Sequence, residues 1–210
     1  FGTIPVAGGM ACDGYRFEQT MQFVGGNQFT GGAAFLGMSG QFEHAIWVTS
    51  GWSPIGARHE ARTDGANIVH RIGDQDAVGF YKHYAGDNPQ GWHQIPLAVF
   101  EGDGDEHYLR VPIAPREDGG IEFAGTFPAR ARVQLAEVGR EDLLATANAI
   151  NWAALTSPGW ENPAAALVFS CCSRHIILGS RTGEEQAGVA RALGELPVAG
   201  FYTYGEITPL

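Results

Sequence analysis

The fold class follows from three pieces of sequence near the end of the chain: PAAALVFSCCSR (163–174), TGEEQAGVARALGEL (182–196) and PVAGFYTYGEI (197–207). The first is apolar until Ser170, which is typical of a buried strand that ends in polar residues. The second predicts a helix with Thr182 as its N-cap and with Glu184 and Glu185 in its first turn. The third again reads as a strand, so this stretch predicts a β-α-β arrangement.

The same alternation extends upstream. ARVQLAEVG (131–139) is typical of a strand, and REDLLATANAINWAALTS (140–157) carries the clearest helical pattern in the chain. Its apolar residues recur on one side of the predicted helix: Leu143, Leu144, Ala147, Ile150, Ala154 and Leu155. The second half is therefore predicted to be β-α-β-α-β.

The first half predicts short strands joined by glycine-rich turns. A short helix is expected within residues 74–87, and the segment 51–73 reads as turn-rich with one strand at 67–72. Strands are expected at 3–9, within 17–26 as a hairpin closed by Gly25-Gly26, and at 30–40, 44–52, 95–102, 107–114 and 120–128. The expected fold class is α+β, with antiparallel or mixed sheets and a few helices.

The two ends of the chain share a motif. Pro5-Val6-Ala7-Gly8 is repeated as Pro197-Val198-Ala199-Gly200, and in both copies a glycine-rich or aromatic run follows. One interpretation is two unrelated strands that end in turns. The other is a duplication, in which two sheet-containing halves contribute equivalent strands whose glycines border a shared ligand site.

Composition excludes several function classes. The 210 residues carry a net charge of −10 and Lys82 is the only lysine, which argues against nucleic acid and anionic membrane surfaces as partners. No apolar stretch approaches the length that spans a bilayer. The three cysteines, Cys12, Cys171 and Cys172, form no disulfide framework, so reduced thiols and a cytoplasmic location are expected.

The residues at the end of the chain resemble the C-terminal half of the FIST domain, a bacterial sensory module. That half has an apolar strand ending in Cys-x-x-Arg, an acidic helix, and a strand ending in Gly-Phe-x-x-x-Gly-Glu. The matching positions here are Cys171, Arg174, Glu185, Gly200, Phe201, Gly205 and Glu206. PVAGGMACDG, GWSPIG and TDGANIVHRIGDQDAVGFYKHY resemble the N-terminal half, whose first segment is missing.

The resemblance implies a domain organisation and a function. Residues 1–135 would form the latter part of the FIST N-like half and residues 136–210 the FIST C-like half, together making one compact ligand-binding unit. The implied function is cytoplasmic sensing of a small ligand, such as an amino acid or a derivative, without catalysis. The implied partners are histidine kinases, cyclic-di-nucleotide enzymes or chemoreceptors. This sequence departs from the family pattern at Cys172-Ser173 and at Ser50.

Each candidate ligand residue has two interpretations. Arg174 can clamp a carboxylate or form an ion pair with Glu206 or Glu185. Glu206 can receive an ammonium group or neutralise Arg174. The aromatic candidates can line a pocket or pack in the fold, and Cys171 can be reactive or inert. The predicted ligand-binding residues are Arg174, Glu206, Tyr204, Tyr202, Cys171 and Trp52.

Alternative functions remain open at this point. The resemblance also implies a haem-binding nitric-oxide sensor, with haem b held by one histidine among His70, His83 and His175. Otherwise no cofactor is expected, and no histidine has zinc-like spacing. A Cys-dependent enzyme and a docking scaffold without ligand are two further readings.

Overall fold

The computed structural model describes residues 4–156 and 163–209, and the side chains within 150–156 are outside that description. The chain forms two compact units. The first comprises Phe1–Gly51 with Arg140–Leu210, and the second comprises Trp52–Gly139. Both units contain sheet and helix, so the predicted α+β class is confirmed.

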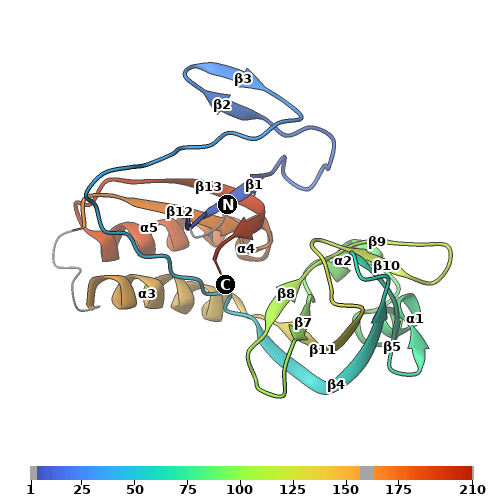
Figure 1. Ribbon diagram of the computed structural model, residues 1–210. Helices are drawn as coiled ribbons and strands as arrows, with labels where there is room; N and C mark the ends of the chain where they lie inside the picture. Colours follow the sequence, from blue (N-terminus) through green and yellow to red (C-terminus); the bar gives the residue numbers. More distant parts are fainter. Residues whose placement is uncertain (1–3, 157–162, 210) are drawn as a thin grey trace. The chain divides into compact units, whose positions relative to one another are not determined.

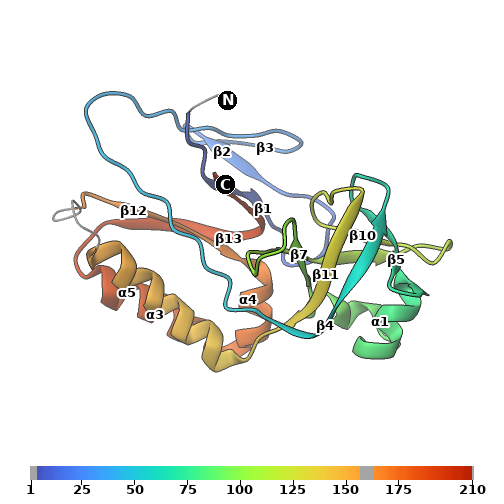
Figure 2. The same cartoon turned by 60° about the horizontal axis from the view of Figure 1, so that its bottom comes forward.

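The first unit is built on a three-stranded mixed sheet with the order β1-β13-β12. Strand β13 (Val198–Ile207) is central, with β12 (Ala166–Cys171) parallel to it and β1 (Gly8–Ala11) antiparallel. Helices α3 (Arg140–Thr156), α4 (Cys172–Leu178) and α5 (Thr182–Leu193) cover one face of this sheet (Figures 1 and 2). The predicted helix–strand–helix–strand order from residue 140 onward is therefore confirmed in this unit, with α4 as an additional helix that begins inside the segment predicted as a strand.

One of the two predicted helices of this unit differs from prediction at its start. Thr182 is the first residue of α5 and not its N-cap, and its hydroxyl donates to the carbonyl of Gly179, 2.7 Å away. Leu143 and Ala147 of α3 are buried as predicted. The side chains of Ile150, Ala154 and Leu155, expected on the same side, lie outside the described residues.

The two copies of the repeated motif end up as neighbours in one sheet. Strand β1 runs antiparallel beside the second half of β13, with Gly9 opposite Glu206 and Ala11 opposite Thr203. The buried strand predicted over 3–9 is wrong at its start, because the described strand begins only at Gly8 and Ile4 is 71% exposed. The pairing of β1 with β13 fits the expected duplication, as two related halves would contribute one strand each.

The second unit is an eight-stranded antiparallel sheet with the order β8-β7-β11-β4-β5-β10-β9, and β6 pairs with β5. Two helices, α1 (Ala77–Ala85) and the single turn α2 (Pro89–Trp92), belong to the same unit. The strands are β4 (Ser53–Thr63), β5 (Ile68–Ile72), β6 (Gln75–Asp76), β7 (Leu97–Phe100), β8 (Tyr108–Arg110), β9 (Pro112–Pro115), β10 (Ile121–Phe123) and β11 (Arg130–Glu137).

The core of the second unit is apolar, and aromatic side chains from its two helices pack into it. Tyr81 from α1 and Trp92 from α2 pack together with ring centroids 5.2 Å apart, and both are fully buried. Asp76 caps α1 by accepting from the backbone N–H of Gly79 at 2.7 Å, which confirms the short helix predicted there.

Two strand predictions in the first half are wrong, and one long strand was not predicted. Residues 30–40 and 44–52 contain no strand, and Phe35 and Leu36 are about three-quarters exposed, so apolar content alone did not create a sheet there. The segment read as turn-rich instead holds the eleven-residue β4. Its many polar side chains suit a strand with one solvated face. Such a strand lacks the continuous apolar run that predicts a buried strand.

The hairpin predicted within residues 17–26 is confirmed, although it extends further. Strands β2 (Gln22–Val24) and β3 (Asn27–Phe29) pair across Gly25 and Gly26, whose φ angles are both positive, as a tight two-residue hairpin turn requires. Among the described residues, no helix combines the length and apolar character needed to cross a membrane.

Candidate functional site

Among the described residues, the serine, threonine and charged side chains that are buried all belong to the first unit. The buried polar residues recorded in the described part of the chain are Ser173, Arg174, Thr182, Glu185 and Thr203. Burying polar groups costs free energy unless each finds a partner, so such a group is a stronger indication of a site than an apolar core. The first unit is therefore where a site is to be sought.

Arg174 is the centre of this polar interior. It lies on α4, its side chain is 9% exposed, and its Nε donates to Oε1 of Glu185 at 2.5 Å. Nη1 donates to the carbonyl of Ser50 at 3.0 Å, and Nη2 donates to the carbonyl of Leu143 at 2.8 Å. The ion pair with Glu185, one of the two readings that the sequence left open, is thus present, and it ties three separate segments together.

Glu185 connects Arg174 to the central strand. Its second carboxylate oxygen accepts from the hydroxyl of Tyr202 at 2.8 Å. Burial and this hydrogen bond raise the pKa of Tyr202. The ring of His175 lies 5.1 Å from that of Tyr202, and its Nδ1 is 3.2 Å from the hydroxyl of Thr182. Two predicted ligand residues, Arg174 and Tyr202, are therefore brought together through a shared carboxylate.

A second polar group lies where β1 and β12 end, on either side of the middle of β13. Thr203 pairs with Ala11 of β1 on one side and with Cys171 of β12 on the other. Its hydroxyl donates to Glu206 Oε1 at 2.6 Å. Loss of hydration raises the pKa of Glu206, and burial followed by the nearby Glu206 carboxylate raises the pKa of Cys171. The structure thus brings Glu206 and Cys171 together, and we call Glu206, Thr203 and Cys171 the strand-end cluster.

The loop that follows β1 adds aromatic groups to this end of the sheet. The carboxylate of Asp13 accepts from the hydroxyl of Tyr204 and from the backbone N–H groups of Phe17, Glu18 and Gln19, 2.8–3.0 Å away. These donors hold the pKa of Asp13 well below its usual range. The ring of Phe17 stacks on that of Tyr204 at 4.6 Å.

This loop is also strained. Tyr15 and Phe17 have φ angles of 65° and 54°, a conformation that non-glycine residues seldom adopt. Such strain persists only where surrounding contacts fix the backbone, and it is concentrated at functional sites. Here the carboxylate of Asp13 supplies the fixing contacts. Sequence analysis missed Asp13, since its partner Tyr204 lies at the other end of the chain.

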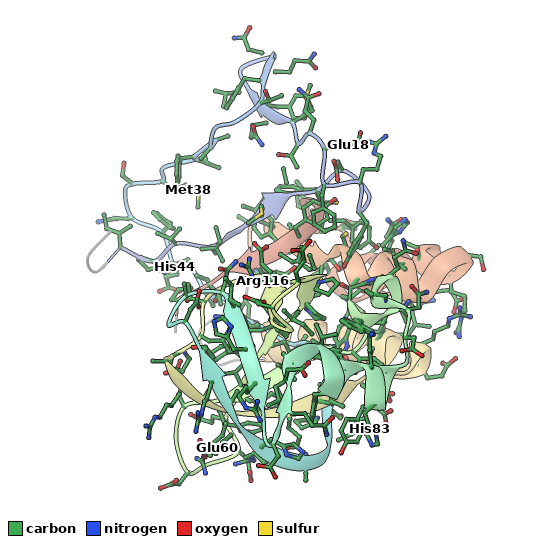
Figure 3. All side chains as sticks on the ribbon, turned by 90° about the vertical axis from the view of Figure 1, so that its right-hand side faces the viewer. Glu18, Met38, His44, Glu60, His83 and Arg116 are labelled. Atoms are coloured by element: carbon green, nitrogen blue, oxygen red, sulfur yellow. The ribbon has the colours of Figure 1, made fainter. Side chains whose placement is uncertain are left out.

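The remaining candidates are placed separately. Trp52 belongs to the second unit, where it is buried and its Nε1 donates to the carbonyl of Gln94 at 3.4 Å. His70 on β5 and His83 on α1 are exposed residues of that unit (Figure 3 labels His83). His175 is exposed on α4 of the first unit. None of the three histidines is enclosed, so their surroundings do not favour a haem site, and the haem reading stays a prediction.

The described side chains contain no group of three or more His, Cys, Asp or Glu residues arranged to hold a metal ion. Cys12, Cys171 and Cys172 are all free thiols. The strand-end cluster therefore consists of a carboxylate, a hydroxyl and a thiol, and Tyr204, whose ring stacks on that of Phe17, lies on the same strand as Thr203 and Glu206. Such a group can bind a small polar ligand by hydrogen bonds and charge.

Two family models match the chain. The FIST N domain matches residues 1–75, and the FIST C domain matches residues 77–209. No curated protein and no solved structure matches it. The boundary expected between residues 135 and 136 stays a prediction. Because the two matches span nearly all of its length, the chain belongs to the FIST family, whose domains are sensory domains for small ligands in signalling.

Proposed function

We propose that this domain senses an amino acid or an amino-acid derivative and that the ligand's ammonium group is received by Glu206 in the strand-end cluster. One observation carries the proposal: the Glu206 carboxylate lies beside the Cys171 thiol, and its pKa is raised by loss of hydration. Glu206 is an exposed residue, so a ligand can reach its carboxylate, and a carboxylate that has lost part of its hydration gains more from a bound cation than a fully solvated one does.

The neighbours of Glu206 suit the rest of such a ligand. The hydroxyl of Thr203 orients the carboxylate. The stacked rings of Tyr204 and Phe17 offer an aromatic surface, and Phe17 is 55% exposed. An ammonium group over such a ring gains a further cation–π attraction.

Arg174 and Tyr202 act in this proposal as positioning residues. The guanidinium is buried and already donates to Glu185, Ser50 and Leu143, so a ligand carboxylate would have to displace a protein partner to be clamped by it. Through Glu185 it fixes Tyr202 on the strand that also carries Glu206. Trp52 stays a predicted ligand contact.

The test is isothermal titration with a panel of free amino acids and with the matching acids that lack the amine. Wild-type protein is expected to bind at least one amine-bearing ligand and not its deaminated analogue. Glu206→Gln is expected to reduce that affinity about tenfold or more, since charge-assisted hydrogen bonds contribute about 1.5–3 kcal/mol. Glu195→Gln makes the same substitution at another exposed glutamate and is the matched control.

Equal binding of the amine-bearing and deaminated ligands would contradict the role of Glu206, as would unchanged affinity in Glu206→Gln. The proposal further includes a cytoplasmic setting and signalling partners of the kinds that FIST domains accompany: histidine kinases, cyclic-di-nucleotide enzymes and chemoreceptors. It includes no catalytic step. No observation on the described residues favours the haem alternative enough for a second proposal.

A further inference from the structure

Three arginines stand in one row across the sheet of the second unit. Arg130 on β11 lies directly opposite Arg62 on β4, and Arg62 lies directly opposite Arg71 on β5. These three strands are neighbours in the sheet (Figure 1). Directly opposite residues of an antiparallel pair project from the same face, so the register places all three side chains on one face. We call them the arginine row.

The arginine row belongs to the solvent face of the sheet. The residues next to the three arginines along their strands, Ala61, Ile72 and Ala131, are buried in the apolar core. Successive residues of a strand point to opposite faces, so the arginines are directed away from the core. All three are exposed. A molecule in solution can therefore reach them.

The fold leaves the charges of the arginine row without anionic partners. No carboxylate in the described part of the chain forms an ion pair with any of the three. Nη2 of Arg71 donates to the carbonyl of Asp74 at 2.6 Å, and the carboxylate of Asp76, opposite Arg71, caps α1. In the next row of the same face, Glu60 lies opposite Arg132. Like charges directly opposite each other destabilise a sheet, so the arginine row is not explained by stability.

Two other arginines of this face show which chemical group it binds. Arg132 forms an ion pair with Asp103 at 3.3 Å, and Arg58 forms one with Asp105 at 3.1 Å. The guanidinium of Arg58 also lies over the ring of Phe100, 3.6 Å from its centroid, and Phe100 is opposite Arg132. Both aspartates come from the exposed loop between β7 and β8. This face thus already holds carboxylates of an acidic loop of its own chain.

We propose that the arginine row binds a short segment of a partner protein that is rich in aspartate or glutamate. The guanidinium fork matches a carboxylate bidentately. Neighbouring strands lie about 4.8 Å apart, so the row spans about 10 Å, and acidic residues at alternate positions of an extended peptide, about 6.6 Å apart, match that span. The net charge of −10 repels a long polyanion that extends past the row, which favours a short protein segment over nucleic acid. This binding does not depend on the proposed amino-acid site.

The experiment titrates a fluorescently labelled hexa-aspartate peptide with the whole chain at low salt and measures anisotropy. We expect saturable binding that weakens as salt is added, and none with hexa-asparagine. Arg62→Gln combined with Arg130→Gln should reduce the affinity about tenfold or more, because charge-assisted hydrogen bonds are lost. Lys82→Gln combined with Arg191→Gln removes two exposed positive charges elsewhere and should bind like wild type.

Several outcomes would overturn the proposal. These are no saturable binding of hexa-aspartate, equal binding of the two peptides, equal affinities of the two double variants, and tighter binding of a single-stranded DNA oligonucleotide than of hexa-aspartate. A urea midpoint of Arg62→Gln with Arg130→Gln far below wild type would also count against it, since it would give the arginines a structural role. We expect that midpoint to equal or exceed wild type, because opposed like charges are removed from an exposed face.

Discussion

Arg174 and Glu185 form a buried ion pair in which Nε and Oε1 lie 2.5 Å apart. Each partner is further bonded, Arg174 to two backbone carbonyls and Glu185 to the hydroxyl of Tyr202. A buried pair of this kind does not by itself make a protein stable, but removing one partner leaves an uncompensated charge inside it. The pair therefore holds α4, α5 and β13 in a single arrangement.

Replacing Arg174 by Ala tests this arrangement. We expect the free energy of unfolding to fall by about 3–5 kcal/mol, because Glu185 loses its cationic partner while it stays buried. Urea denaturation measures the change. The double variant Arg174→Met with Glu185→Leu removes both charges and is expected to lose less than Arg174→Ala alone. A single variant as stable as wild type would show that the pair does not fix the fold.

Gly8 and Gly200 occupy the same place in the repeated motif but have different surroundings. A Cβ on Gly200 would lie 1.9 Å from the carbonyl oxygen of Val168, whereas a Cβ on Gly8 meets no heavy atom within 4 Å. Gly200→Ala is expected to force β12 and β13 apart and to destabilise the protein by about 1–3 kcal/mol, as overpacking typically does. Thermal unfolding would measure this loss.

Gly8→Ala is the matched control for that experiment. It adds the same methyl group to the other copy of the motif and should leave the melting temperature within about 2 °C of wild type, since an unhindered surface change shifts stability little. Equal losses from both substitutions would mean that the two copies pack alike, contrary to the structure.

Burial also predicts slow alkylation at two of the three cysteines. It raises the pKa of both Cys171 and Cys172, so at neutral pH less of each thiol is present as the reactive thiolate than in a free cysteine. Iodoacetamide labelling of these two residues, followed by mass spectrometry, should be slower in the native protein than in urea. The rate should rise with pH as the thiols ionise. Native labelling as fast as in urea would contradict this prediction.

Local signals explain which elements could be predicted from the sequence. Asp76 begins α1 and the acidic first turn begins α5, and both helices lie where those residues indicated. β4 was missed because a half-solvated strand lacks the apolar run by which β12 was recognised. Cys172 also starts a helix directly after β12, so strand alternation could not give the direction of Arg174.

The candidate site could be predicted only in part because its contacts are long-range. Arg174, Tyr202, Tyr204, Glu206 and Cys171 were identified from a motif near the end of the chain. The partners that give them their arrangement are elsewhere: Asp13 and Tyr15 follow β1, and Ser50 supplies a carbonyl. Spacing within a sequence carries no information on such pairings, which depend on how β1 docks against β13.

The raised pKa of Glu206 gives a pH dependence with a definite sign. An acid whose pKa is higher in the folded state than in the unfolded state favours folding while it is protonated, so its contribution is present below the ordinary value of 4.5 and is lost as the pH rises through the folded-state pKa. Glu206→Gln, which keeps an acceptor for Thr203, should therefore be more stable than wild type at neutral pH, and this advantage should disappear in acid. Urea midpoints on both sides of that range measure it, with Glu195→Gln as the control at another exposed glutamate. An advantage of Glu206→Gln that grew as the pH fell would show that the carboxylate is stabilised by the fold, and would remove the electrostatic reason for placing an ammonium ligand beside it.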